Sequence, residues 1–176
     1  MNAQLTVYIG KKIAHFLQEF AAYSPEMQEF DMENDSRDVI IRNPACPDSD
    51  EDAIYIEFGE EFTVYWHTHR HFSPEDYWYD MLVEFVHDIL DGKTTVAALF
   101  DNAGKWRAIG LLENKELPEE PEEAVTLFAP TDEQVQFCRE RGIPTKTRDD
   151  YLKYLDSGCY YKIWNWTEPM KNVRFG

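Results

Sequence analysis

The spacing of apolar residues along the chain predicts a series of short helices and strands. Between residues 10 and 23 the apolar side chains recur every three or four positions, which predicts a helix with one apolar stripe. Residues 53–58 and 61–69 alternate apolar and polar side chains across a glycine-containing turn, which predicts a hairpin. The same pattern at 95–100 and 106–112 predicts a second hairpin.

A further helix is predicted over residues 74–91. Ser73 is a good N-cap, Pro74 suits the first helical position, and Gly92 ends the run. We expect the apolar face of this helix to lie on a sheet. The positions that share this face are Trp78, Met81, Leu82, Phe85 and Ile89.

Two acidic segments carry weaker patterns. Residues 26–60 are rich in acids, and we expect one short strand at 39–41 inside a surface loop. Residues 113–123 contain six glutamates and two prolines, which predicts a solvated connection.

Towards the C-terminus, residues 125–129 suggest a strand. Thr131 and Gln134 form a capping box, which predicts a short helix that is closed near Gly142. Residues 159–167 alternate and are rich in aromatic side chains, which predicts a last strand.

The order of these elements favours an α+β fold, mainly an antiparallel sheet built from hairpins with two to four helices packed on it. We expect both hairpins to belong to one sheet, covered by the 74–91 helix. We also expect a single domain over residues 1–176, because a chain of 20.8 kDa buries about 70% of its unfolded surface on folding. The acidic connection at 113–123 then lies on its surface.

The charge of the chain narrows its possible partners. There are 34 acidic and 17 basic residues, a net charge of −17, while 43% of the residues are hydrophobic and 15% aromatic. The hydrophobic share indicates a folded body rather than a disordered acidic chain. A field of this sign repels phosphates, so we expect no nucleic-acid partner and favour a basic protein partner.

The sequence also bears on the compartment. We find no apolar run followed by a small-residue cleavage site near the N-terminus and no apolar stretch of membrane-spanning length. Cys46, Cys138 and Cys159 are widely spaced, which indicates reduced thiols rather than disulfides or a thiolate zinc site. We therefore expect a cytoplasmic protein that is not in a membrane.

The common catalytic motifs are missing from the sequence. It contains no GxGxxG, GxxxxGK[ST], GxSxG or HExxH pattern, so dinucleotide binding, P-loop, serine hydrolase and common zincin functions lack their motifs. The most chemical stretch is instead the histidine run that follows residue 61. If this stretch continues as one strand, His67, His69 and His71 lie on one face together with Thr63 and Tyr65.

The spacing of His67, His69 and Asp80 resembles the zinc site of the JAMM metalloproteases. In that family two histidines and one aspartate hold zinc, and an upstream glutamate acts as base. The resemblance implies that these three residues are zinc ligands and that Glu57, or an earlier acid, is the base. Two positions differ from the family, since Arg70 replaces its proline and Tyr77 replaces its serine.

The same histidines also have simpler explanations. A histidine run at the end of a strand is typical of a polar patch at a sheet edge, of a metal cluster without catalysis, or of ordinary packing. A polar patch or ordinary packing needs no cofactor, which is what we expect, whereas a non-catalytic cluster requires a metal ion and the JAMM-like hypothesis requires zinc.

The C-terminal aromatic residues suggest a protein contact. Exposed Tyr and Trp residues ringed by carboxylates are typical of protein-binding surfaces. We therefore predict partner-binding residues in the acidic connection and in the last strand. They are Glu119, Glu120, Glu122, Glu123, Trp164 and Trp166.

Two functional hypotheses follow. In its size and negative charge the chain resembles the small acidic immunity proteins of bacteria, which neutralise toxins that are often basic. The resemblance implies a soluble, partner-binding protein that is not an enzyme. The alternative is a JAMM-like zinc-dependent hydrolase. The first explains the charge and the second explains the histidines, and we prefer the first.

Overall fold

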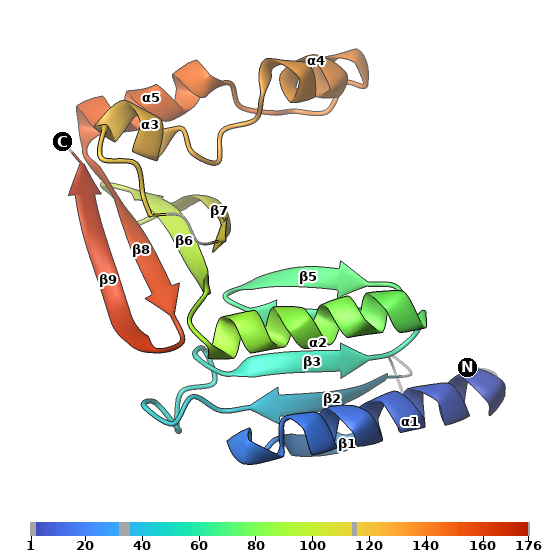
Figure 1. Ribbon diagram of the computed structural model, residues 1–176. Coiled ribbons are helices and arrows are strands. Elements are labelled where there is room, and N and C mark those ends of the chain that lie inside the picture. The colour runs from blue at the N-terminus through green and yellow to red at the C-terminus, as the bar shows by residue number, and fades with distance from the viewer. Residues whose placement is uncertain (1–2, 32–35, 114–115, 176) are drawn as a thin grey trace. The chain divides into compact units, whose positions relative to one another are not determined.

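The computed structural model describes residues 3–31, 36–113 and 116–175. The chain divides into two compact units, residues 1–90 and 91–176, and each is described by itself. The expectation of a single domain stays a prediction. The predicted α+β class is confirmed, because antiparallel sheets built from hairpins occur together with helices (Figure 1).

The first unit pairs five strands in chain order into one antiparallel sheet, sheet A. Its elements are α1 (Ala3–Glu19), η1 (Ala21–Tyr23), β1 (Glu26–Asp31), β2 (Ser36–Ile41), β3 (Ile54–Phe58), β4 (Phe62–Trp66), β5 (Thr68–Phe72) and α2 (Asp76–Leu90).

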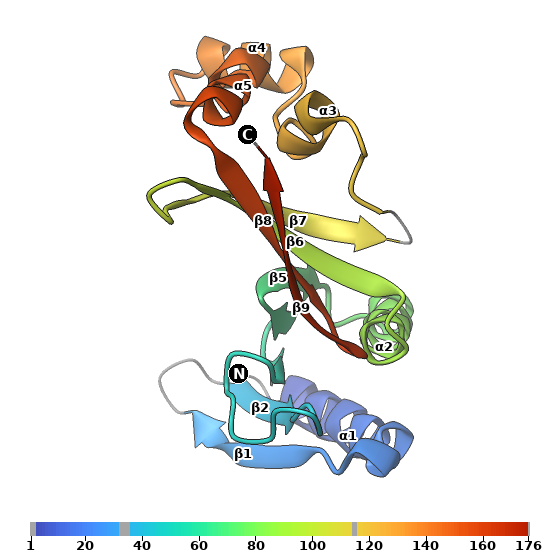
Figure 2. The same cartoon turned by 90° about the vertical axis from the view of Figure 1, so that its left-hand side faces the viewer.

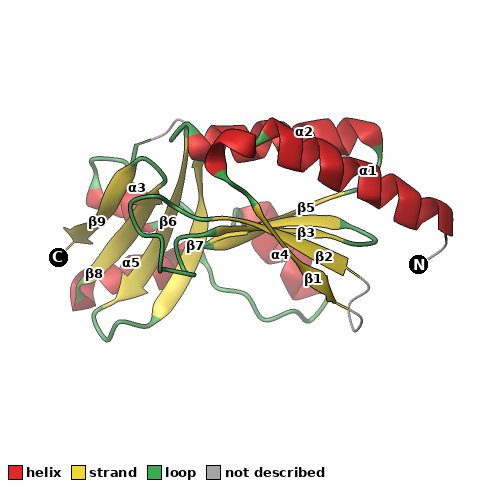
Figure 3. Cartoon of the chain, turned by 90° about the horizontal axis from the view of Figure 1, so that it is seen from below, coloured by secondary structure: helices red, strands yellow, loops and turns green. Residues whose placement is uncertain are grey.

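Both helices of this unit lie on one face of sheet A (Figure 3). Phe16 of α1 contacts Phe58 of β3, with their ring centroids 5.6 Å apart, and Phe85 of α2 contacts Phe72 of β5 at 6.0 Å. The predicted alternation is confirmed in β3, whereas in β4 Thr63 is buried together with its neighbours Phe62 and Val64. The residues buried beneath the helices are Val39, Ile41, Ile54, Ile56, Phe58, Phe62 and Val64.

The two helices run in the same direction and contact each other through polar side chains. The Tyr8 hydroxyl donates to Asp76 at 2.9 Å near their first turns, and His87 Nε2 lies 2.9 Å from Glu19 Oε1 near their ends. Between them lies the buried side chain of Tyr79. Burial raises the pKa of Tyr79, so its hydroxyl keeps its proton.

One predicted core position of α2 is wrong. Leu82, Phe85 and Ile89 are buried as expected, but Trp78 is 40% exposed while its neighbour Tyr79 is 2% exposed. The reason is that α2 packs on α1 as well as on the sheet. The buried arc is therefore turned towards α1, where the Tyr79 hydroxyl donates to a carbonyl oxygen at 3.1 Å.

The prediction of one strand over residues 61–69 is also wrong. β4 ends at Trp66, His67 takes a φ of 54°, and β5 runs back antiparallel beside β4. A residue other than glycine at positive φ is uncommon, and the alternating pattern runs unbroken through this turn. The predicted hairpin is nevertheless present, formed by β3 with β4.

The acidic segment 26–60 contains two strands before β3 rather than one. β2 includes the predicted strand at 39–41, but β1 lies in the part that was predicted as loop. All six residues of β1 are exposed, so it has no apolar alternation. Hydrophobic periodicity therefore contains no signal for this strand.

The second unit forms a separate four-stranded antiparallel sheet, sheet B, in the order β7-β6-β8-β9. Figure 2 shows its three helices gathered beyond the strands. Its elements are β6 (Thr94–Asp101), β7 (Trp106–Glu113), α3 (Pro121–Val125), α4 (Asp132–Glu140), α5 (Arg148–Ser157), β8 (Cys159–Asn165) and β9 (Glu168–Phe175).

The prediction that both hairpins belong to one sheet is wrong, because β3 and β4 lie in sheet A while β6 and β7 lie in sheet B. A hairpin is recognised from its own turn and alternation. These local features contain no information about which strand pairs with the outer edges of the hairpin.

No helix among the described residues is long and apolar enough to cross a membrane.

In the second unit one further prediction is wrong and two are confirmed. The strand predicted at 125–129 is wrong, because helix α3 begins at Pro121 and ends at Val125, with acids in its first turn. The capping box of Thr131 and Gln134 is confirmed at the start of α4. The predicted last strand is β8, and the exposed edge strand β9 follows it.

Candidate functional site

The face of sheet A opposite the helices carries polar and aromatic side chains from four neighbouring strands. No helix of the first unit lies over it in the part of the chain that is described (Figure 3). Cross-strand pairing places these side chains in two adjacent rows. We call this surface the open face; it consists of Asp38 of β2, Tyr55 and Glu57 of β3, Thr63 and Tyr65 of β4, and His69 and His71 of β5.

Two of the three histidines lie as predicted. His69 pairs with Tyr65 and His71 pairs with Thr63, so all four share one face. The two imidazole centroids are 5.1 Å apart, and His71 Nδ1 lies 3.0 Å from the Thr63 hydroxyl oxygen. Both histidines are exposed, which makes them part of the accessible surface.

His67 lies elsewhere, at the reversal between β4 and β5. Its Nε2 atom is 3.5 Å from a carboxylate oxygen of Asp52. Burial lowers the pKa of His67, although Asp52 and Glu51 act in the opposite direction. A shielded imidazole beside a carboxylate at a tight turn indicates a structural role for His67.

The placement of Asp80 does not fit the JAMM-like zinc site. Asp80 is exposed on α2, and α2 lies on the side of sheet A opposite to His69. Among the described residues no group of three or more His, Cys, Asp and Glu side chains is placed to hold a metal ion. The structure therefore does not bring His67, His69 and Asp80 together as a ligand set.

Glu57, the predicted base of that alternative, takes part in a different arrangement. Its carboxylate accepts a hydrogen bond from the Tyr65 hydroxyl at 2.9 Å. Across the other neighbouring strand it pairs with Asp38, so two carboxylates stand opposite each other. Burial of Asp38, together with the charges of Glu57 and Asp31, raises the pKa of the Asp38 carboxyl.

This carboxylate pair is unfavourable for the isolated protein. Like charges directly opposite each other on neighbouring strands destabilise a sheet. Neither Asp38 nor Glu57 forms an ion pair among those resolved between described residues. A cationic group placed between them relieves the repulsion.

The predicted partner-binding residues of the second unit are distributed around α3 and β8. Glu119, Glu120, Glu122 and Glu123 are all exposed, and the last three line a shallow groove with Arg148. Trp164 is half-buried, whereas Trp166 is only 7% exposed and has little surface for a partner. Their role in binding stays a prediction.

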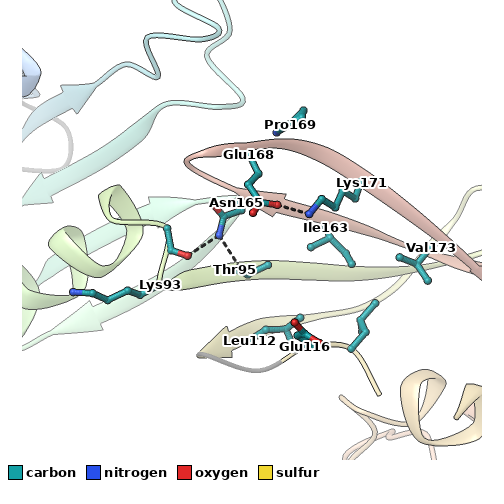
Figure 4. A pocket seen from close by; sticks show the side chains of 12 residues that line it. Lys93, Thr95, Leu112, Glu116, Ile163, Asn165, Glu168, Pro169, Lys171 and Val173 are labelled. Atoms are coloured by element: carbon teal, nitrogen blue, oxygen red, sulfur yellow. Dashed lines mark hydrogen bonds and ion pairs between the residues drawn. The ribbon is translucent and has the colours of Figure 1, made fainter. Parts of the chain in front are cut away.

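A cavity of about 550 Å³ lies at one end of sheet B (Figure 4). Its apolar lining includes Ile163 and Val173. The amide of Asn165 at its centre donates to the Gly92 carbonyl at 2.8 Å and to the Thr95 hydroxyl at 3.0 Å. These polar groups satisfy one another. The cavity is also lined by the charged side chains of Lys93, Glu116, Glu168 and Lys171.

The three cysteines are free thiols, as predicted. Cys159 is buried, and burial raises its pKa to about 11. A thiol with such a pKa remains protonated near neutral pH, so Cys159 is unsuited to nucleophilic chemistry.

Sequence reasoning missed Asp38 and Tyr55 as members of the open face. Tyr55 alternates with the buried residues Ile54 and Ile56, whereas Asp38 is followed by three buried residues in a row and shows no alternation. The alternation at Tyr55 is a usable signal for one face of a strand. Their neighbourhood depends on strand pairing, which no local pattern specifies.

Comparison of the chain with protein-family models, with curated proteins and with solved structures finds no match in any of the three.

Proposed function

We propose that this chain is a non-enzymatic binding protein that neutralises or sequesters a basic protein partner in the bacterial cytoplasm, in the manner of an immunity protein. The observation that carries the proposal is the open face, where two carboxylates stand opposite each other beside exposed aromatic side chains. The function lies in recognition rather than in chemistry.

The distribution of charge supports this proposal. Residues 1–90 contain 19 acidic and 5 basic residues, a net charge of −14, while residues 91–176 contain 15 and 12, a net charge of −3. A field of this strength attracts a basic partner and raises the rate of encounter. The unit that carries the open face is thus also the one towards which a cationic protein is drawn.

The side chains of the open face suit a basic partner once contact is made. Tyr65 is 40% exposed, and its hydroxyl is held by Glu57, which fixes the ring on the surface. Lys and Arg side chains bind both to carboxylates and to the faces of tyrosine rings. A cation over Asp38 and Glu57 also removes their mutual repulsion.

The proposal is tested with a fluorescent peptide of ten arginines as the basic probe. We compare the double variant Asp38→Asn/Glu57→Gln with the charge-matched control Asp80→Asn/Glu84→Gln, whose acids are exposed on α2. The open-face variant is expected to raise the dissociation constant at least fivefold over the control, measured by fluorescence anisotropy. Equal losses in the two variants show that only total charge matters and contradict the proposal.

A further inference from the structure

The four edge strands of the two sheets are protected unequally. Register shifts interrupt the pairing of β1 with β2, of β6 with β7 and of β8 with β9. β5 instead pairs with β4 in continuous register over five residue pairs. Bulges, prolines and charged side chains are the usual means by which proteins prevent an edge from pairing with another strand.

The composition of β5 adds to this difference. β1 carries three acids in six residues and β9 contains Pro169, whereas β5 contains neither an acid nor a proline. Its Arg70 is folded over the rings of Phe72 and Phe85, with the guanidinium carbon 5.3 and 5.0 Å from their centroids. The outer backbone edge of β5 is thus left without these protective features.

Helix α2 provides an apolar border along the same edge. Phe85 lies over β5, in contact with Phe72. Trp78 is two helical turns earlier on the same stripe, and 40% of it is exposed. We expect a strand placed beside β5 to lie under this stripe and to cover Trp78, which is the exposed member of the stripe.

Carboxylates lie at both ends of β5. Glu61 is 3.9 Å from His71 near one end, and Asp52 is 3.5 Å from His67 at the other. A five-residue strand spans about 17 Å. A strand of this length with basic residues at both ends and β-branched residues between them matches the edge in length, polarity and charge.

We propose that the partner donates an extended strand of this kind to the outer edge of β5, so that sheet A gains a sixth strand. This inference rests on the proposed function, because the donor is the same basic partner. Backbone hydrogen bonds to β5 supply affinity, and the basic ends supply specificity.

The test uses the peptide Lys-Lys-Val-Thr-Val-Thr-Val-Lys-Lys and an analogue N-methylated at all five residues between its two pairs of lysines, so that both backbone edges are blocked. The two peptides have the same charge, but the analogue lacks the backbone donors that a strand pair requires. We expect the analogue to bind at least tenfold more weakly. Hydrogen exchange of those amides within residues 68–72 that face away from β4 is expected to slow at least tenfold with the unmodified peptide alone.

Two variants give an independent readout. Trp78→Ala is expected to weaken binding of the unmodified peptide at least threefold, whereas Tyr77→Ala on the outer side of α2, where Tyr77 is 68% exposed, leaves it unchanged. If both peptides bind equally while binding of the arginine probe still depends on Asp38 and Glu57, strand addition is overturned and the proposed function stands. If binding of the arginine probe does not depend on Asp38 and Glu57 either, the proposed function itself is overturned.

Discussion

Asp38 and Glu57 are single residues whose proposed role in binding conflicts with the stability of the isolated protein. They are directly opposite each other on β2 and β3, and the neighbouring charge contributes to the raised pKa of Asp38. A sheet selected for stability alone places unlike charges or uncharged residues at such a pair. The arrangement is thus one that a partner's cation improves.

Replacing Asp38 by Asn is therefore expected to stabilise the protein at neutral pH. A carboxyl whose pKa is raised on folding binds its proton more tightly in the folded state. Its contribution to stability is present below the unfolded value of 3.8 and is lost as pH rises through the folded value.

We expect Asp38→Asn to increase the free energy of unfolding by about 0.2–1 kcal/mol at pH 7, the range for cross-strand pairs. The gain should disappear below pH 3.8. Urea unfolding at several pH values measures it, with Glu84→Gln as the control for total charge. A gain that is equal at pH 7 and at pH 3 shows that the effect does not come from ionisation.

Metal content provides a second prediction at the residue scale. Because His69 and Asp80 lie on opposite sides of sheet A, we expect the dialysed protein to contain less than one zinc per chain by elemental analysis. His69→Ala and Asp80→Ala are expected to leave that content unchanged. Stoichiometric zinc that Asp80→Ala removes restores the hydrolase alternative.

Among the elements, α2 connects the core to the proposed partner edge. Its Phe85 contacts Phe72 on β5 and is 7% exposed, while Trp78 on the same stripe is 40% exposed. We expect Phe85→Ala to lower the free energy of unfolding by about 3–5 kcal/mol. Trp78→Ala should change it by less than about 1 kcal/mol, measured by urea unfolding followed by far-UV circular dichroism. Similar losses in the two variants contradict this division of roles.

How much of the fold is visible in the sequence depends on the kind of signal. The hairpin β3–β4, the stripe of α2 and the capping box at Thr131 rest on local spacing, and the structure contains them. The turn at His67 and the exposed strand β1 have no local signal. Which strands belong to sheet A and which to sheet B depends on pairing between residues that are far apart in the sequence.

The residues of the candidate site also divide into those that local spacing predicts and those that only strand pairing brings together. The shared face of His69 and His71 is predictable, because it follows from a period of two along one strand. The pair of Asp38 and Glu57 is not, since the two residues are joined only by the register between β2 and β3. A resemblance based on spacing alone also joined His69 to Asp80, which the sheet separates.

For the whole molecule, the concentration of negative charge in residues 1–90 predicts strongly salt-dependent association. Exposed charges are screened within about 10 Å at 0.1 M ionic strength. We expect the association rate with the arginine probe to fall steeply between low salt and 0.3 M. Stopped-flow fluorescence measures this dependence.

Two sets of acids are expected to act on different rate constants. Replacing Glu119, Glu120, Glu122 and Glu123 by Gln should lower the association rate and the salt slope, because these exposed acids act over a distance. Asp38→Asn/Glu57→Gln should instead raise the dissociation rate, because those acids make contact. An unchanged salt slope in the first variant places the interface away from residues 119–123.

The parallel pairing of α1 with α2 has a consequence during synthesis. Tyr8 and Glu19 find their partners Asp76 and His87 only 68 residues later in the chain. At about 5–20 residues per second, α1 leaves the ribosome roughly 3–14 s before the helix that it packs against. For that interval Phe16 and Phe20 lack their final cover, so the speed of translation sets how long the nascent chain is open to aggregation.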